Sequence, residues 1–259
     1  MKVLVIGGSG LVAGLILPYL KEKYDLRVFD MKPPADLSLE YISGNVTDLE
    51  ALVQAMTGVD AFLYMAMGTL GIDFKDREVY LRALDTAFDV NVKGTYFASR
   101  AAHEAGVPHA VYASSLSIYK GGYGRSHPDG RYYAHEDMVP DALDRYGLTK
   151  RLGEDVFRAA ALQWGLTVNA LRLCRPLSTE DYQERMRLDV PSIPTEESDV
   201  ARAFDAALQY RPAGFEAFFI SGDYQEKTMS MAKAKKLLNW EPLARPTKTR
   251  TEEEKARKW

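Results

Sequence analysis

The chain has 259 residues, of which 46% are hydrophobic and 27% charged, enough for a large buried core. Its net charge of −3 and the lack of any long apolar run give no sign of a nucleic-acid or membrane partner. The single cysteine, Cys174, cannot form an internal disulfide, and the apolar run at residues 3–6 is too short for a signal peptide. We therefore expect a cytoplasmic protein, and the spacing of its four histidines and one cysteine predicts no metal site.

Short apolar runs alternate with helical patterns along most of the chain, which is typical of a parallel sheet covered by helices on both faces. We expect an α/β fold, a Rossmann-like doubly wound parallel sheet with a small C-terminal substrate lobe. The expected domains are a dinucleotide-binding domain over 1–176, a substrate-binding lobe over 177–245 and a charged tail over 246–259. Residues 195–222 are expected to pack back onto the first domain.

The elements follow from apolar periodicity and from helix-capping residues. The expected strands cover residues 3–6, 26–29, 39–42, 60–65, 109–113, 166–173 and 217–221. The expected helices cover residues 11–20, 47–56, 140–164, 195–210 and 228–238, and one more helix, which follows a loop that ends at about Arg77, contains Phe88 and runs to Gly106. The helix over 47–56 is expected to start with a capping box made by Thr47 and Glu50.

The first thirty residues read as strand, glycine turn, helix, strand and acid, the order that a dinucleotide-binding βαβ unit requires. Gly7 allows the tight turn, and Gly10 lets a pyrophosphate approach the N–H groups that open the helix. Asp30 lies about twenty residues later, where a carboxylate can accept hydrogen bonds from the adenosine ribose. A glycine turn also occurs in α/β proteins that bind no nucleotide. The whole order of elements favours cofactor binding.

Ser115, Tyr146 and Lys150 could carry acid/base chemistry. Tyr146 and Lys150 are four residues apart in a predicted helix and share one face. A nearby ammonium lowers the pKa of a phenol, and a serine at a strand end can orient a substrate hydroxyl. This set suits proton transfer coupled to hydride transfer. Tyr19 and Lys23 have the same spacing, so the argument depends on Ser115 lying at the carboxyl end of a strand. The alternative is an inert fold that keeps the three residues for structural reasons.

Seven segments occur in an order shared with one family: residues 7–13, 44–48, 64–68, 91–95, 111–119, 146–150 and 171–176. Over nearly its whole length the chain resembles the extended short-chain dehydrogenase/reductases, the NAD-dependent epimerase/dehydratase family. It departs from the family pattern at Ala13, where a third glycine is usual, and at Asn45, where an aspartate usually contacts adenine.

The resemblance implies that Tyr146 is the acid/base, that Lys150 holds the nicotinamide ribose and tunes Tyr146, and that Ser115 positions the reacting hydroxyl. Ser115 is favoured over Ser114 because it stands four residues before Tyr119. The implied cofactor contacts are Gly7, Gly10, Leu11, Val12, Asp30, Asn45, Val46, Met65, Ala66, Met67, Asn91, Ala113, Tyr146, Lys150 and Pro176.

The expected cofactor is NAD, because the carboxylate of Asp30 would repel the 2′-phosphate of NADP, although Lys32 nearby acts in the opposite sense. The same resemblance implies a homodimer formed by the helices around residues 89–105 and 141–164.

The region after Pro176 is smaller than in the nucleotide-sugar enzymes of the family, which predicts a small sugar-like or sugar-acid substrate. The expected substrate-binding residues are Ser115, Leu116, Ser117 and Arg175, the last in place of a usual asparagine. Arg125, His127 and Arg131 are further candidates for binding an anionic group. The compact hexuronate dehydrogenases of the family are similar in size, although the match at their substrate positions is poor.

We expect an NAD-dependent oxidoreductase. An epimerase or dehydratase that reduces NAD only transiently is the alternative within the enzyme class. A non-catalytic dinucleotide sensor is the alternative outside it.

Overall fold

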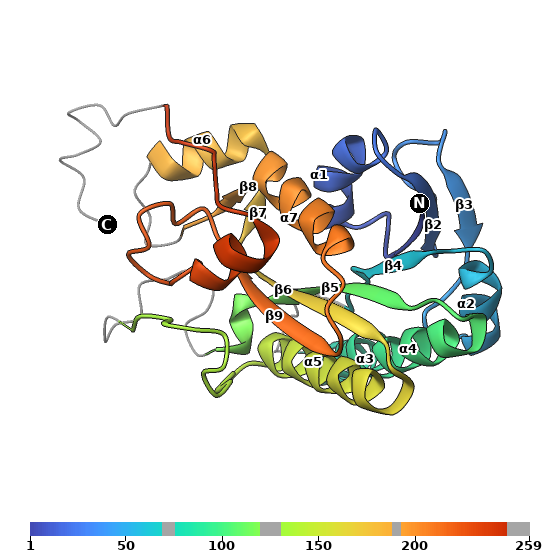
Figure 1. Ribbon diagram of the computed structural model, residues 1–259. Coiled ribbons are helices and arrows are strands. Elements are labelled where there is room, and N and C mark those ends of the chain that lie inside the picture. The colour runs from blue at the N-terminus through green and yellow to red at the C-terminus, as the bar shows by residue number, and fades with distance from the viewer. Residues whose placement is uncertain (69–75, 120–130, 188–192, 248–259) are drawn as a thin grey trace.

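A seven-stranded parallel sheet runs through the centre of the computed structural model, which describes residues 1–68, 76–119, 131–187 and 193–247 (Figure 1). The strand order is β3-β2-β1-β4-β5-β6-β9. The strands are β1 (Lys2–Ile6), β2 (Asp25–Asp30), β3 (Glu40–Ser43), β4 (Ala61–Tyr64), β5 (His109–Ser115), β6 (Thr167–Leu173) and β9 (Phe215–Ile220). The order changes direction between β1 and β4, and a ligand crevice is expected at such a point. The predicted Rossmann-like fold class is confirmed.

Helices cover both faces of the sheet because each strand is apolar on both sides. In β1, Val3 and Val5 enter one core, whereas Leu4 and Ile6 enter the other. The first face is covered by α1 (Leu11–Leu20) and α7 (Glu197–Gln209). The opposite face is covered by α2 (Leu49–Met56), α3 (Arg77–Phe88), α4 (Gly94–Ala105) and α5 (Arg145–Trp164).

The chain after β6 adds a small group of elements beside α1 and α7. It contains the two-stranded parallel pair β7 (Pro176–Leu177) and β8 (Thr195–Glu196), the helix α6 (Thr179–Arg187) and the π-helical turn η3 (Ala234–Leu238). The buried carboxylate of Asp199 accepts hydrogen bonds from the backbone N–H groups of Leu243 and Ala244, and so ties the later chain to α7. The division into a domain over 1–176 and a lobe over 177–245 stays a prediction.

Three helices start later than predicted because an acidic residue further along the chain caps each of them. The helix expected over 195–210 begins at Glu197, with Glu196 as its cap. The helix expected over 140–164 begins at Arg145, since Asp144 accepts a hydrogen bond from the N–H of Gly147. The helix expected from 47 begins at Leu49 with Asp48 as its cap, so the proposed Thr47–Glu50 capping box is wrong.

Two helical predictions also miss local changes in winding. The helix expected to contain Phe88 and to run to Gly106 is interrupted by the π-helical turn η1 (Asp89–Lys93) between α3 and α4. The helix expected over 228–238 is reduced to η3 and the residues just before it, and the short helix α6 is not predicted at all. In the described part of the chain, no helix is long and apolar enough to cross a membrane.

Candidate active site

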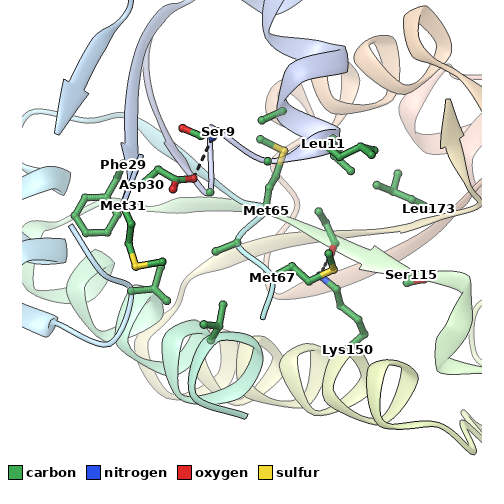
Figure 2. A pocket seen from close by; sticks show the side chains of 18 of the residues that line it. Ser9, Leu11, Phe29, Asp30, Met31, Met65, Met67, Ser115, Lys150 and Leu173 are labelled. Carbon is green, nitrogen blue, oxygen red and sulfur yellow. Dashed lines mark hydrogen bonds between the residues drawn. The ribbon is translucent and has the colours of Figure 1, made fainter. Parts of the chain in front are cut away.

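A cavity of about 560 Å³ lies at the carboxyl ends of the central strands (Figure 2). Its size lies within the range of roughly 300–1,000 Å³ typical of ligand sites. The predicted site residues that line it are Gly7, Gly10, Leu11, Val12, Asp30, Asn45, Val46, Met65, Ala66, Met67, Ala113, Ser115, Ser117, Tyr146, Lys150, Arg175 and Pro176. Figure 2 shows Ser9 and Asp30 at one end of the cavity and Ser115 and Lys150 at the other.

The glycine turn brings the start of α1 to the cavity. Gly7 has a φ of +82°, and a Cβ there would lie 2.3 Å from the backbone nitrogen of Ala66, so a larger residue cannot be accommodated. Gly10 precedes α1, whose first turn has neither a side-chain cap nor an acidic residue. No acidic side chain of that turn therefore competes for its free N–H groups. These N–H groups suit the negative charge of a dinucleotide's pyrophosphate.

Asp30 is held in one orientation at the end of β2. Its carboxylate accepts hydrogen bonds from the backbone N–H groups of Ser9 at 3.0 Å and Lys32 at 3.2 Å. The Ser9 hydroxyl in turn donates to the Lys32 carbonyl at 2.6 Å, which joins the glycine turn to the chain after β2. A carboxylate has about four acceptor sites, so oxygens remain for the hydroxyls of a ribose.

The structure separates the two serines at the end of β5. The Ser115 hydroxyl faces the cavity and accepts a hydrogen bond from the N–H of Ser117 at 3.1 Å. The Ser114 hydroxyl lies on the other side of the strand, where it donates to Glu154 of α5 at 2.5 Å. Side chains alternate along a strand, so only Ser115 can face the cavity.

Lys150 lies beneath the catalytic end of the cavity. Its Nζ donates to the Ala113 carbonyl of β5 at 2.7 Å and lies 6.0 Å from the centre of the Tyr146 ring. Burial lowers the pKa of the Lys150 ammonium to about 8, although the Glu154 carboxylate one helical turn later raises it.

Two glycines allow α5 to lie against β5. A Cβ at Gly147 would lie 2.0 Å from the Ser117 carbonyl, and one at Gly153 would lie 2.4 Å from the Tyr112 hydroxyl. This close contact brings Tyr146 and Lys150 up to the residues that follow β5.

Sequence reasoning missed a buried ion pair behind the site. Arg172 of β6 donates to both oxygens of Glu154 at 2.9 and 2.8 Å, and both side chains are 3% exposed. The same guanidinium donates to the Tyr119 hydroxyl at 2.8 Å and to the Glu136 carbonyl at 2.5 Å. Arg172 of β6 therefore joins α5 to Tyr119 and to the backbone at Glu136. An arginine in a buried strand, and a glutamate four residues after Lys150, were the available signals.

Two predicted contacts are corrected. Asn91 is buried in η1, where it accepts from the N–H of Gly68 at 2.8 Å and donates to the Thr149 hydroxyl at 2.9 Å. It positions the residue before Lys150, and its neighbour Val90 lines the cavity instead. Leu116 does not line the cavity either, because its side chain packs in the apolar core.

Three further residues were expected to bind an anionic group. Arg125 and His127 lie outside the residues that the structure describes. Arg131 forms an ion pair with Asp141 at 2.8 Å. Among the residues that the structure describes, no group of histidine, cysteine or acidic side chains could hold a metal ion.

The lowered pKa of Lys150 predicts a pH-dependent contribution to stability. Between about pH 8 and the ordinary value of 10.5, the unfolded chain binds more protons at this lysine than the folded chain does. The free energy of unfolding should therefore rise with pH in this window, relative to a Lys150→Met variant, by about 1–2 kcal/mol. Urea unfolding of both proteins at about pH 7 and about pH 9.5 measures the change. An equal difference between the proteins at both pH values would contradict it.

Comparisons with known proteins give partial sequence matches and similar folds. The chain is 34% identical over 132 residues to a 3-beta-hydroxysteroid dehydrogenase of Mycolicibacterium neoaurum, covering 47% of this chain and 34% of that protein. The match thus spans about a third of that relative's length. MoeE5 in complex with UDP-glucuronic acid and NAD has a similar fold, with a TM-score of 0.76, 22% identity and 95% of each chain covered. Uronate dehydrogenase from Agrobacterium tumefaciens has a TM-score of 0.75 and 19% identity, over 94% of this chain and 84% of that one.

A family model extends the match well beyond the glycine turn. It covers residues 3–193, which include Asp30, Ser115, Tyr146, Lys150 and Arg175. The chain belongs to the NAD dependent epimerase/dehydratase family.

Proposed function

We propose that the protein is an NAD-dependent oxidoreductase that oxidises a hydroxyl group of a small sugar acid. One observation carries the proposal: Ser115, Tyr146 and Lys150 line the same cavity as the glycine turn and Asp30. A binding site for the cofactor and a set of acid/base groups thus meet at the carboxyl edge of the sheet, where active sites of this architecture lie.

The side chains fit proton transfer during oxidation. NAD, when bound, supplies the hydride acceptor. Ser115 orients the substrate hydroxyl, and Tyr146 removes its proton. The buried Lys150 ammonium favours the phenolate form of Tyr146, because an opposite charge nearby stabilises the ionised group. An epimerase would use the same three residues, so these residues support the chemistry of both enzyme classes.

The orientation of Asp30 supports NAD over NADP. Hydrogen bonds from Ser9 and Lys32 keep its carboxylate at the cavity, so it cannot turn away from a 2′-phosphate. The repulsion between the two negative charges would disfavour NADP.

Arg175 supports an acidic substrate. It lines the cavity, half-buried, with a φ of +40° that is unusual for a residue other than glycine. Within the described residues, no carboxylate forms an ion pair with its guanidinium. A strained backbone that holds an unpaired arginine at a cavity is typical of a ligand site, and a guanidinium suits a carboxylate or phosphate.

The proposal extends to assembly and location. A second, apolar hollow on the outer surface of α4 and α5 is lined by Tyr96, Leu152, Val156 and Trp164, among others. We propose that a second copy of the chain covers this surface in a homodimer. The single, buried Cys174 is consistent with a reducing compartment such as the cytoplasm.

Replacement of Tyr146 by phenylalanine tests the chemistry. The variant should form NADH from sugar acids at least 100-fold more slowly, because it lacks the group that removes the proton. Its dissociation constant for NAD should stay within about twofold of the wild-type value, since the ring remains. Tyr19→Phe, at the 41% exposed tyrosine of α1, is the matched control and should be fully active. Epimerised product without net NADH would indicate an epimerase, and NAD binding without any turnover would favour a sensor.

Replacement of Arg175 by glutamine tests the substrate class. The KM for sugar acids should rise by about 10- to 100-fold, which corresponds to the loss of a hydrogen bond to a charged group. Turnover of the matching neutral sugars and the dissociation constant for NAD should not change. Weaker NAD binding instead would show that Arg175 holds the cofactor.

Sedimentation velocity of the wild type and a Tyr96→Glu variant tests the dimer. The wild type should sediment as a dimer, and a charge in the apolar hollow should shift the variant towards the monomer. A monomeric wild type would refute the proposal.

A further inference from the structure

Asn45 lines the cavity just after β3, an edge strand of the sheet, whereas Ser115 ends β5. Asp30 pairs with Ser43 where β2 and β3 end, and the N–H of Gly44 donates to the Asp30 carbonyl at 3.0 Å. Asn45 follows directly and lines the same cavity. It is therefore beside Asp30, on the side of β2 that faces away from β1.

With the pyrophosphate at the glycine turn and the ribose at Asp30, the base of the cofactor would lie towards β3, beside Asn45. The pyrophosphate fits the glycine turn after β1, the ribose fits Asp30 after β2, and β3 is the next strand in that direction. The cavity wall here consists mainly of apolar side chains, namely Met31, Val46 and Val90, which suit the faces of a purine. Asn45 adds an amide to these apolar walls.

The hydrogen bonds of Asn45 determine which half of its amide remains for a ligand. Its Oδ1 accepts from the backbone N–H and from the hydroxyl of Thr47, both at 3.0 Å. A backbone N–H can only donate, so rotation of the amide by half a turn would place two donors against each other. The Asn45 carbonyl also accepts from the N–H of Asp48 at 2.9 Å, which holds the backbone turn. Within the described residues, the amide Nδ2 has no partner.

We propose that Asn45 contacts the purine only as a hydrogen-bond donor, so that this site does not recognise the 6-amino group of adenine. An adenine offers ring nitrogens as acceptors, but its 6-amino group is a donor and has no bond to make with Nδ2. A hypoxanthine base carries an oxygen at that position and can accept from the same amide. An aspartate at position 45 would present an acceptor to the amine. The inference concerns cofactor recognition and does not depend on the proposed substrate.

Isothermal titration calorimetry with NAD and with nicotinamide hypoxanthine dinucleotide tests the inference without any turnover. The wild type should bind the two dinucleotides with dissociation constants within about threefold of each other. In Asn45→Asp, one carboxylate oxygen should still accept from the N–H of Thr47 and the other should accept from the amine. The preference for NAD should then rise to at least about tenfold, as a hydrogen bond to a charged acceptor can provide.

Ser43→Asp is the matched control. Ser43 ends β3, is exposed and does not line the cavity. An aspartate there would therefore add the same negative charge near the site but could not accept a hydrogen bond from the purine. Its ratio of dissociation constants should equal that of the wild type, because repulsion of the phosphates affects both dinucleotides alike.

Three results would overturn the inference. The first is a wild-type preference for NAD above tenfold, and the second is a ratio of dissociation constants in Asn45→Asp equal to that of the wild type. The third is a wild type that binds neither dinucleotide. A protein that binds both dinucleotides as expected but oxidises no sugar acid would contradict the proposed function alone.

Discussion

The contact between α5 and β5 is the constraint on which the candidate active site depends. Gly147 lies against the Ser117 carbonyl just after β5, and Gly153 lies against the Tyr112 hydroxyl of β5, so a side chain at either position would push the helix away. Lys150 crosses this contact to the Ala113 carbonyl, and Glu154 crosses it to the Ser114 hydroxyl. Since one face of α5 carries all these groups, a shift of the helix would move the acid/base residues away from Ser115 together.

Charge balance beneath the site follows from the same contact. Lys150 is removed from water, which disfavours its charge, and Glu154 one turn further along the helix offsets part of that cost. Glu154 itself is neutralised by Arg172, whose remaining donors hold Tyr119 and the Glu136 backbone. Breaking such a buried pair by removing one partner costs about 3–5 kcal/mol. The ion pair therefore links the stability of the fold to the geometry of the cavity.

The two ends of the cavity differ in chemistry. Towards β3, backbone N–H groups hold Asp30 and Asn45 in set orientations beside apolar walls, which suits a ribose and a base. Towards β6, the cavity has a hydroxyl, a phenol, an ammonium and the guanidinium of Arg175. Asn45 and Arg175 are both departures from the usual family residues. Asn45 lies towards β3 and Arg175 towards β6, so Asn45 is suited to changing the recognition of the cofactor's base and Arg175 that of the substrate.

Local patterns in the sequence were sufficient for the strands, the glycine turn and the acid/base residues. Gly7, Asp30, Tyr146 and Lys150 lie within short motifs whose geometry is set by a few neighbouring residues, so their placement in one cavity could be anticipated. The choice of Ser115 over Ser114 came from the family resemblance; alternation along a strand puts the two serines on opposite sides, and only the structure shows which side faces the cavity. Helix starts were less certain, because Asp48 and Asp144 compete with neighbouring residues as caps.

Tertiary structure alone decided the roles that depend on distant partners. Asn91 looks like a cofactor contact in sequence, but its amide is used by Gly68 and by Thr149, which lies 58 residues further along the chain. The pairing of Glu154 with Arg172 likewise joins a helix to a strand, and neither residue has a local motif. By itself, the sequence determined the order of the seven strands of the main sheet and the residue types at their carboxyl edge, because periodicity and glycine turns are local properties; it missed β7, α6 and β8. Which polar groups face the cavity and which are used inside the protein was decided by packing, since a buried polar group must bond to whatever the fold brings next to it.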